Sequence, residues 1–137
     1  MVATGFEDAL LLSARVLFGG VIAFMGLNHF LQLEQMTGYA AFKGLPAPKL
    51  SVAASGAVLV LGGLGIIVGA FPLVSALAIA GFLLVSALLM HDFWAVEKDQ
   101  KQDEMTAFLK NVVMAGGALA IAALSAHHWA FSLGIGL

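Results

Sequence analysis

The longest uncharged stretch of the sequence constrains its fold more than any other feature. No Asp, Glu, Lys or Arg occurs from Leu50 to His91, and none occurs from Asn111 to Leu137. Charged residues make up 10% of the chain, against about 25% in soluble domains. A soluble protein of 137 residues has too much surface for its volume to bury so many apolar side chains. The sequence therefore predicts an integral membrane protein, because lipid can solvate apolar surface.

The spacing of the apolar stretches predicts four spans. One span needs about 20 apolar residues, since a helix rises about 1.5 Å per residue. The stretch from Leu50 to His91 is about twice that length, and Phe71-Pro72 divides it because proline suits the first turn of a helix. We expect an all-α fold, a four-transmembrane-helix antiparallel bundle forming a single transmembrane domain over residues 1–137. The predicted spans are residues 9–31, 51–70, 72–91 and 105–126.

The connection between the first two spans has a helical pattern. Apolar and aromatic residues recur there at every third position: Met36, Tyr39, Phe42 and Leu45. This spacing predicts a short interfacial helix over residues 36–45, closed by Gly44 and broken by Pro46 and Pro48. The alternative is an ordinary loop.

Basic residues predict the orientation of the spans. Five lysines belong to the side of the 32–50 and 95–104 connections, and Arg15 alone belongs to the other side. The five are Lys43, Lys49, Lys98, Lys101 and Lys110. Because Lys and Arg are enriched in cytoplasmic loops, we expect a multi-pass protein of the cell membrane with both connections in the cytoplasm and both termini outside.

The first span carries small and polar residues on one face: Arg15, Gly19, Ile22, Gly26 and His29. Because arginine is costly in contact with lipid, this face is expected to turn into the bundle. Arg15 is a structural polar residue in this interpretation. Snorkelling to the near interface is the first expectation for its side chain, and binding of Glu7, Asp8, a lipid phosphate or a carbonyl of another helix is the alternative.

Threading the four spans brings polar residues to one end of the bundle. The candidate ligand-binding residues are Asn28, His29, His91, Asp92, Trp94 and Asn111. The histidines could exchange protons near neutral pH, the amides could hydrogen-bond a carbonyl such as a quinone oxygen, and the aromatic side chain could flank a ring. The alternative is that these residues anchor helix ends among lipid headgroups, where polar groups are easily solvated. Asn111 lies deeper and fits that alternative least.

Other kinds of site have little support. The chain contains no cysteine, which excludes disulfides and thiolate chemistry within it. No His-x-x-x-His or Glu-x-x-His spacing occurs on a predicted helix, so we expect no metal site. No residue is assigned a catalytic role. A net charge of −2 without a basic patch gives no reason to expect nucleic acid as a partner.

Several short motifs, in their order and spacing, resemble the DoxX family of small four-helix membrane proteins. They are Arg15, Met25 to Phe30, Phe42 to Pro48, Gly62 to Gly65 with Gly69, His91 to Trp94, and Phe108 to Asn111 with Gly116-Gly117. Many relatives carry a Glu in the second span that could pair with the Arg. This chain has no acidic residue between Leu50 and His91.

The resemblance implies a role near membrane redox chemistry. The family is named for a subunit associated with a thiosulfate:quinone oxidoreductase, and other members are linked to oxidative-stress and thiol-redox assemblies. We therefore expect a membrane subunit or anchor of a redox system, not an enzyme on its own, with a quinone-like or lipid ligand at the polar end. A homo-oligomer or a membrane redox protein would be its partner in the bilayer. The alternatives are a structural or lipid-organising protein without catalysis and a transport accessory.

Overall fold

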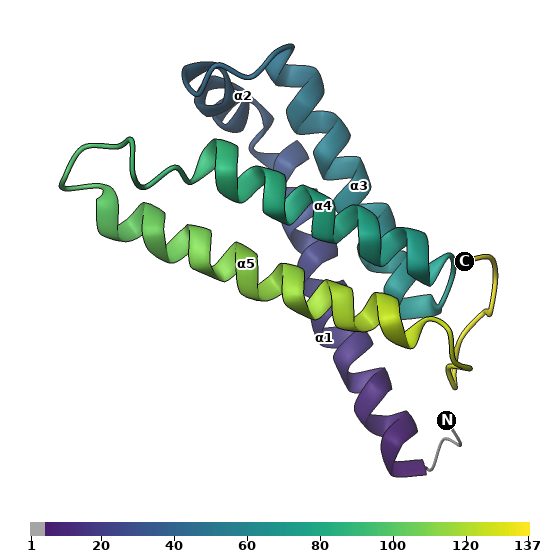
Figure 1. Ribbon diagram of the computed structural model, residues 1–137. Helices are drawn as coiled ribbons and strands as arrows, with labels where there is room; N and C mark the ends of the chain where they lie inside the picture. The colour runs from purple at the N-terminus through teal and green to yellow at the C-terminus, as the bar shows by residue number, and fades with distance from the viewer. Residues whose placement is uncertain (1–4) are drawn as a thin grey trace.

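A computed structural model describes residues 5–137, and the chain folds there into five helices (Figure 1). They are α1 (Gly5–Leu31), α2 (Leu33–Phe42), α3 (Pro48–Val68), α4 (Pro72–Met90) and α5 (Lys101–Leu124). All except α2 are long and apolar enough to cross a membrane. The prediction of an all-α, four-span bundle with a short helix between the first two spans is confirmed.

The helices form two antiparallel pairs. α1 packs mainly on α3, α4 packs mainly on α5, and contacts between α3 and α4 join the pairs. Figure 1 shows that the two pairs cross instead of lying parallel to one another. Side chains at the crossing form an apolar core that includes Ile22, Leu59, Ile66, Ile79 and Leu83, each no more than 1% exposed.

Glycines bring α1 and α3 into backbone contact. A Cβ added at Gly19 would lie 2.5 Å from the carbonyl oxygen of Gly63, and one added at Gly26 would lie 2.7 Å from that of Gly56. No side chain larger than hydrogen fits at such distances, so the small residues set how closely the helices approach. The buried residues of α1 are the five of the predicted stripe, which confirms that this face turns into the bundle.

Proline and glycine set the ends of the helices. Pro72 occupies the first turn of α4, as predicted. Pro48 lies beyond the end of α2, as predicted, and it also starts α3. The short helix α2 spans Leu33–Phe42 instead of residues 36–45, and Gly44 follows it with a φ of +81°.

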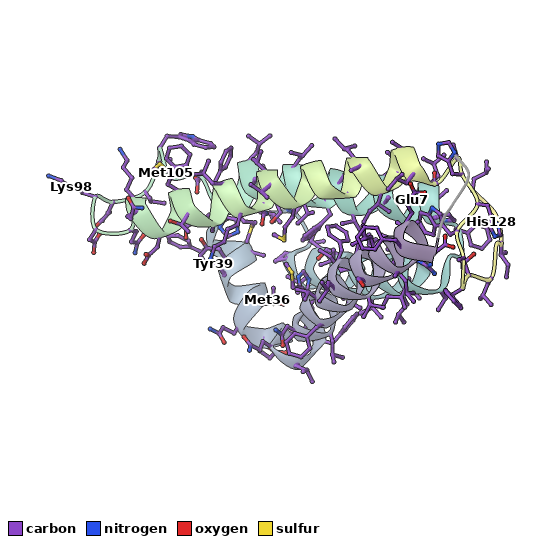
Figure 2. All side chains as sticks on the ribbon, turned by 90° about the horizontal axis from the view of Figure 1, so that it is seen from below. Glu7, Met36, Tyr39, Lys98, Met105 and His128 are labelled. Carbon is purple, nitrogen blue, oxygen red and sulfur yellow. The ribbon has the colours of Figure 1, made fainter. Side chains whose placement is uncertain are left out.

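The C-terminal segment, residues 125–137, folds back over the turn between α3 and α4 (yellow in Figure 1). The amide of Leu133 donates to the carbonyl of Val68 at 2.7 Å, and the amide of Phe71 donates to the carbonyl of Ile135 at 2.6 Å. This segment therefore closes the end of the bundle opposite α2. Figure 2 shows His128 at this end of the molecule and Lys98 at the other.

Candidate functional site

Arg15 lies at the end closed by the C-terminal segment, and its side chain is fully buried. Its guanidinium donates to four backbone carbonyls: those of Ile66 at 3.2 Å, Ile67 at 2.6 Å, Ala130 at 2.7 Å and Phe131 at 2.9 Å. It also lies 5.1 Å from the ring centroid of Trp129. The first expectation, that Arg15 snorkels to the interface, is therefore wrong, and the alternative of carbonyls from another helix is correct.

Arg15 completes the hydrogen bonding of the carboxyl end of α3. The last four carbonyls of a helix have no partner inside it, and that end carries partial negative charge. The carbonyl oxygen of Gly65 accepts a hydrogen bond from the amide of Gly69, and that of Val68 accepts one from the amide of Leu133. Arg15 supplies the donors for the two carbonyls between them. A cation can thus be held here by backbone carbonyls, and four of the five N–H donors of its guanidinium are already used.

A cavity of about 730 Å³ lies at the opposite end, below α2. Its walls combine apolar side chains with uncharged hydrogen-bonding groups. The polar residues that line it are His29, Gln32, Gln35, Tyr39, Ser51, Ser55, Ser86, His91 and Asn111. No Asp, Glu, Lys or Arg is among the described residues that line the cavity.

His29 reaches the cavity from the last turn of α1. Its Nδ1 atom lies 3.1 Å from the carbonyl oxygen of Val52 and 3.0 Å from the hydroxyl of Ser55, both on α3. The ring also lies 5.8 Å from that of Phe82. Within residues 5–137, Nε2 has no hydrogen-bond partner, and it is not among the fully buried atoms. The second nitrogen of the ring is therefore open to a ligand.

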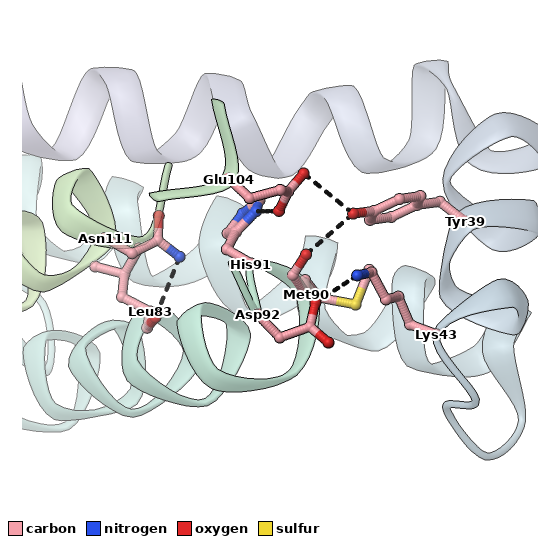
Figure 3. A network of polar contacts seen from close by, with 8 residues as sticks. All are labelled: Tyr39, Lys43, Leu83, Met90, His91, Asp92, Glu104 and Asn111. Carbon is pink, nitrogen blue, oxygen red and sulfur yellow. Dashed lines mark hydrogen bonds and ion pairs between the residues drawn. The ribbon is translucent and has the colours of Figure 1, made fainter. Parts of the chain in front are cut away.

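His91 follows the last turn of α4, and a carboxylate orients it (Figure 3). Its Nδ1 atom lies 3.0 Å from Oε2 of Glu104, in the first turn of α5. The hydroxyl of Tyr39, on α2, lies 3.4 Å from the other oxygen of Glu104 and 3.1 Å from the carbonyl of Met90. In the part of the chain that the structure describes, Nε2 of His91 is also without a partner.

An ion pair between Lys43 and Asp92 ties α2 to the end of α4 (Figure 3). The hydrogen bond from Lys43 lowers the pKa of Asp92, and the same bond raises the pKa of Lys43. Burial, followed by the charge of Glu104, raises the pKa of Tyr39. All three groups therefore keep their usual protonation near neutral pH, with the ion pair charged and the phenol neutral.

The structure brings three of the six candidate ligand-binding residues together at the cavity: His29, His91 and Asn111. Asn111 is 8% exposed, and its side-chain amide donates to the carbonyl of Leu83 at 3.2 Å. The other three candidates are elsewhere. Asn28 does not line the cavity, and Asp92 pairs with Lys43.

Trp94, the sixth candidate, belongs to an aromatic cluster outside the cavity. Its ring packs edge-on against Phe93, with centroids 5.2 Å apart, and against Phe108, with centroids 5.8 Å apart. The side chain is 54% exposed. Phe42, the last residue of α2, is 82% exposed. The structure therefore places these aromatic side chains at the surface of the molecule.

Tyr39, Ser55 and Glu104 were not among the six candidate ligand-binding residues. Ser55 and Glu104 could have been added because both flank the polar end of a predicted span. Tyr39 carried no such signal, since its threefold spacing from Met36 indicated a surface helix and nothing about the direction of its hydroxyl. Among residues 5–137, no three His, Asp or Glu side chains converge as a metal site would require.

Comparison with known proteins gives one match. The model of the family described as DoxX matches residues 10–92. This range runs from the second turn of α1 to Asp92, just after α4. No curated protein and no solved structure matches the chain.

Proposed function

The chain belongs to the DoxX family and is a multi-pass membrane protein, and from that premise we propose that it is a membrane subunit or anchor of a redox system that binds a quinone-like headgroup. The cavity at the α2 end is the binding site, and His29, His91 and Asn111 are its polar contacts. Asn28, Asp92 and Trp94 support the surrounding structure. The protein is not an enzyme on its own in this proposal.

The observation that carries the proposal is the chemistry of the cavity wall. The lining residues offer amide, hydroxyl and imidazole groups, without a Lys or Arg facing the space. A phosphate or carboxylate would need charge-assisted donors there. A neutral headgroup with carbonyl or hydroxyl oxygens needs only the hydrogen bonds that these side chains can form. A quinone therefore fits the wall better than an anionic lipid does.

The apolar part of the wall fits a ligand that enters from the bilayer. Phe82 and Met25 line the inner part of the cavity, while Val85 and Leu89 also line it and are 54% and 50% exposed. The cavity thus reaches the outer, lipid-facing surface of α4. An isoprenoid or alkyl tail could leave through this opening while the headgroup stays among the polar residues.

The two ends of the molecule argue against a role as a transport accessory. A transported solute would have to pass the core around Ile22, Leu59 and Ile79, which is fully buried and apolar. It would then meet the cluster around Arg15, which the C-terminal segment closes. The purely structural or lipid-organising role remains the competing proposal, and the binding test below separates the two.

The placement of the protein in the membrane is also a proposal. We infer that residues 1–137 form a single transmembrane domain with the 32–50 and 95–104 connections in the cytoplasm and both termini outside. The ligand would then bind near the cytoplasmic surface, where a partner subunit or a second copy of the chain could deliver electrons. A tag at residue 98 that reacts with a membrane-impermeant reagent only in opened cells would support this orientation.

Analysis of co-purifying lipids tests the proposed ligand. We expect a quinone in the organic extract of gently purified protein, and binding of a short-chain benzoquinone to protein in lipid nanodiscs. The double variant His29→Ala with Asn111→Ala should bind this benzoquinone at least about tenfold more weakly, since each lost hydrogen bond contributes about 1 kcal/mol. His128→Ala, which changes an exposed histidine at the other end, is the matched control. Binding that is absent, or equal in all three proteins, would contradict the proposal.

A further inference from the structure

The two histidines of the cavity differ in what holds their Nδ1 atoms. His29 hydrogen-bonds a carbonyl and a hydroxyl, both neutral groups. His91 hydrogen-bonds the carboxylate of Glu104 at 3.0 Å. An adjacent carboxylate stabilises an imidazolium, so His91 has a partner whose charge favours the protonated ring, and His29 does not.

Glu104 also determines which nitrogen of His91 is left without a partner, because it engages Nδ1. Its carboxylate oxygen accepts a hydrogen bond from Nδ1–H in the neutral ring and in the charged ring alike. The change between the two states therefore occurs at Nε2, which has no partner among the described residues. A neutral ring presents a lone pair at that position, and a protonated ring presents an N–H donor.

We propose that the His91–Glu104 pair is a protonation switch that decides whether the cavity prefers a carbonyl or a hydroxyl headgroup. This inference rests on the proposed quinone-like ligand and adds its regulation. With His91 protonated, Nε2–H donates to a carbonyl oxygen, so the oxidised headgroup is favoured. With His91 neutral, Nε2 accepts from a hydroxyl, so the reduced headgroup is favoured. Glu104 is a positioning residue, because it acts on the ligand only through the ring.

The charged groups near the His91–Glu104 pair are themselves paired, so we assign the change of protonation to His91. Lys43, directly after α2, is paired with Asp92, two residues after α4, so the two charges compensate each other. The hydroxyl of Tyr39 contacts the other oxygen of Glu104. His29 is the remaining titratable group that lines the cavity. Its neutral partners make it the internal comparison for His91.

The test is a titration of nanodisc-embedded protein with a decyl-substituted benzoquinone and with its hydroquinone, at about pH 5.5 and about pH 8, on either side of the usual range for histidine. Wild-type protein should bind the benzoquinone about tenfold more tightly at the lower pH, because a charged donor replaces a lone pair. The hydroquinone should show the opposite preference or none.

Two variants distinguish a switch from a merely structural pair. His91→Gln should bind the benzoquinone with the same affinity at both pH values, because its amide does not titrate. Glu104→Gln retains an acceptor for Nδ1 but removes the charge that stabilises the imidazolium, so the gain in benzoquinone affinity at the lower pH should shrink. His128→Gln and Glu97→Gln, both exposed in the structure, are matched controls and should behave as wild type.

The outcomes separate this inference from the proposed function. Benzoquinone binding by wild type that is equal at both pH values would overturn the switch and leave the ligand site standing. An unchanged pH profile in folded Glu104→Gln would overturn the role of Glu104. Absence of benzoquinone and hydroquinone binding at both pH values would overturn the ligand site itself and the switch with it. Circular dichroism and gel filtration establish that each variant is folded.

Discussion

Arg15 and His91 are both polar groups near the ends of apolar helices, and the protein satisfies them in opposite ways. All the acceptors around Arg15 are backbone carbonyls of the same chain, and they occupy its guanidinium from several directions. His91 has one nitrogen occupied and one left at a cavity. A buried polar group that is fully bonded stabilises the fold, whereas one left partly unbonded at a cavity is suited to a ligand. The Arg15 cluster is therefore bonded within the protein, and the His91 end is where we propose that a ligand binds.

The largest expected effect tests the structural end. Arg15→Met removes the donors for four carbonyls and should lower the free energy of unfolding in mixed micelles by about 3 kcal/mol. Arg15→Lys should recover only part of this loss, because an ammonium cannot reproduce the fork of a guanidinium. Lys110→Met, at an exposed position of α5, is the matched control. A variant Arg15→Met as stable as wild type would mean that the two ends do not differ as described.

A smaller effect is expected from the ion pair that holds α2 over the cavity. Lys43→Met should weaken the docking of α2 by about 1 kcal/mol, seen as faster chymotrypsin cleavage next to Phe42. The lowered pKa of Asp92 makes this contribution vanish as the pH falls through that pKa, and the raised pKa of Lys43 makes it vanish as the pH rises through that pKa. The contribution should be complete between the ordinary values of 3.8 and 10.5. Lys43→Met lacks the ion pair. If its cleavage accelerated at acid and alkaline pH as much as that of wild type, the ion pair would not be the cause of the pH dependence.

A still smaller effect on stability is expected inside the cavity. Asn111→Leu loses one hydrogen bond to a carbonyl of α4 but gains apolar contact, so the free energy of unfolding should change by less than about 1 kcal/mol. Benzoquinone affinity should nevertheless fall about tenfold. Measuring both quantities on one preparation checks the comparison directly. If Asn111→Leu lowered the free energy of unfolding as much as Arg15→Met, the two ends would contribute equally to stability and the comparison would fail.

No measurable effect is expected from the ion pair between Glu34 and Lys49. Its atoms lie 3.8 Å apart, and the two side chains are 90% and 68% exposed. Exposed pairs of this kind add little, since water and salt screen them. Glu34→Gln should leave thermal unfolding and benzoquinone binding as in wild type, and a clear change in either would show that α2 depends on more than Tyr39 and Lys43.

Periodicity and composition were enough to predict most of the fold. The face of α1 from Arg15 to His29 followed from a spacing of three or four residues, because a helix places such residues together whatever the surroundings. The start of α5 at Lys101 was missed by four residues, since the search for apolar runs detects only the part of a helix that is suited to lipid. The charged first turn of α5 lies before this apolar part and belongs to the same helix.

The candidate site was less predictable because its contacts join distant parts of the chain. Lys43 and Asp92 are 49 residues apart, and Tyr39 and Glu104 are 65 apart. The acceptors of Arg15 are backbone carbonyls, which every residue carries, so no sequence pattern marks them. Asn111 was found because an amide in an apolar helix is unusual by itself.

The bonds of Arg15 also have a consequence for biosynthesis. Ala130 and Phe131 follow Arg15 by 115 and 116 residues, which corresponds to about 6 to 23 s of synthesis at the usual rates. Until they are made, the guanidinium of Arg15 has only the two α3 carbonyls of its four acceptors available. A nascent chain stalled before residue 130 should therefore hold α1 in a water-accessible or chaperone-bound position, and release of the last residues should allow it to settle in the bilayer.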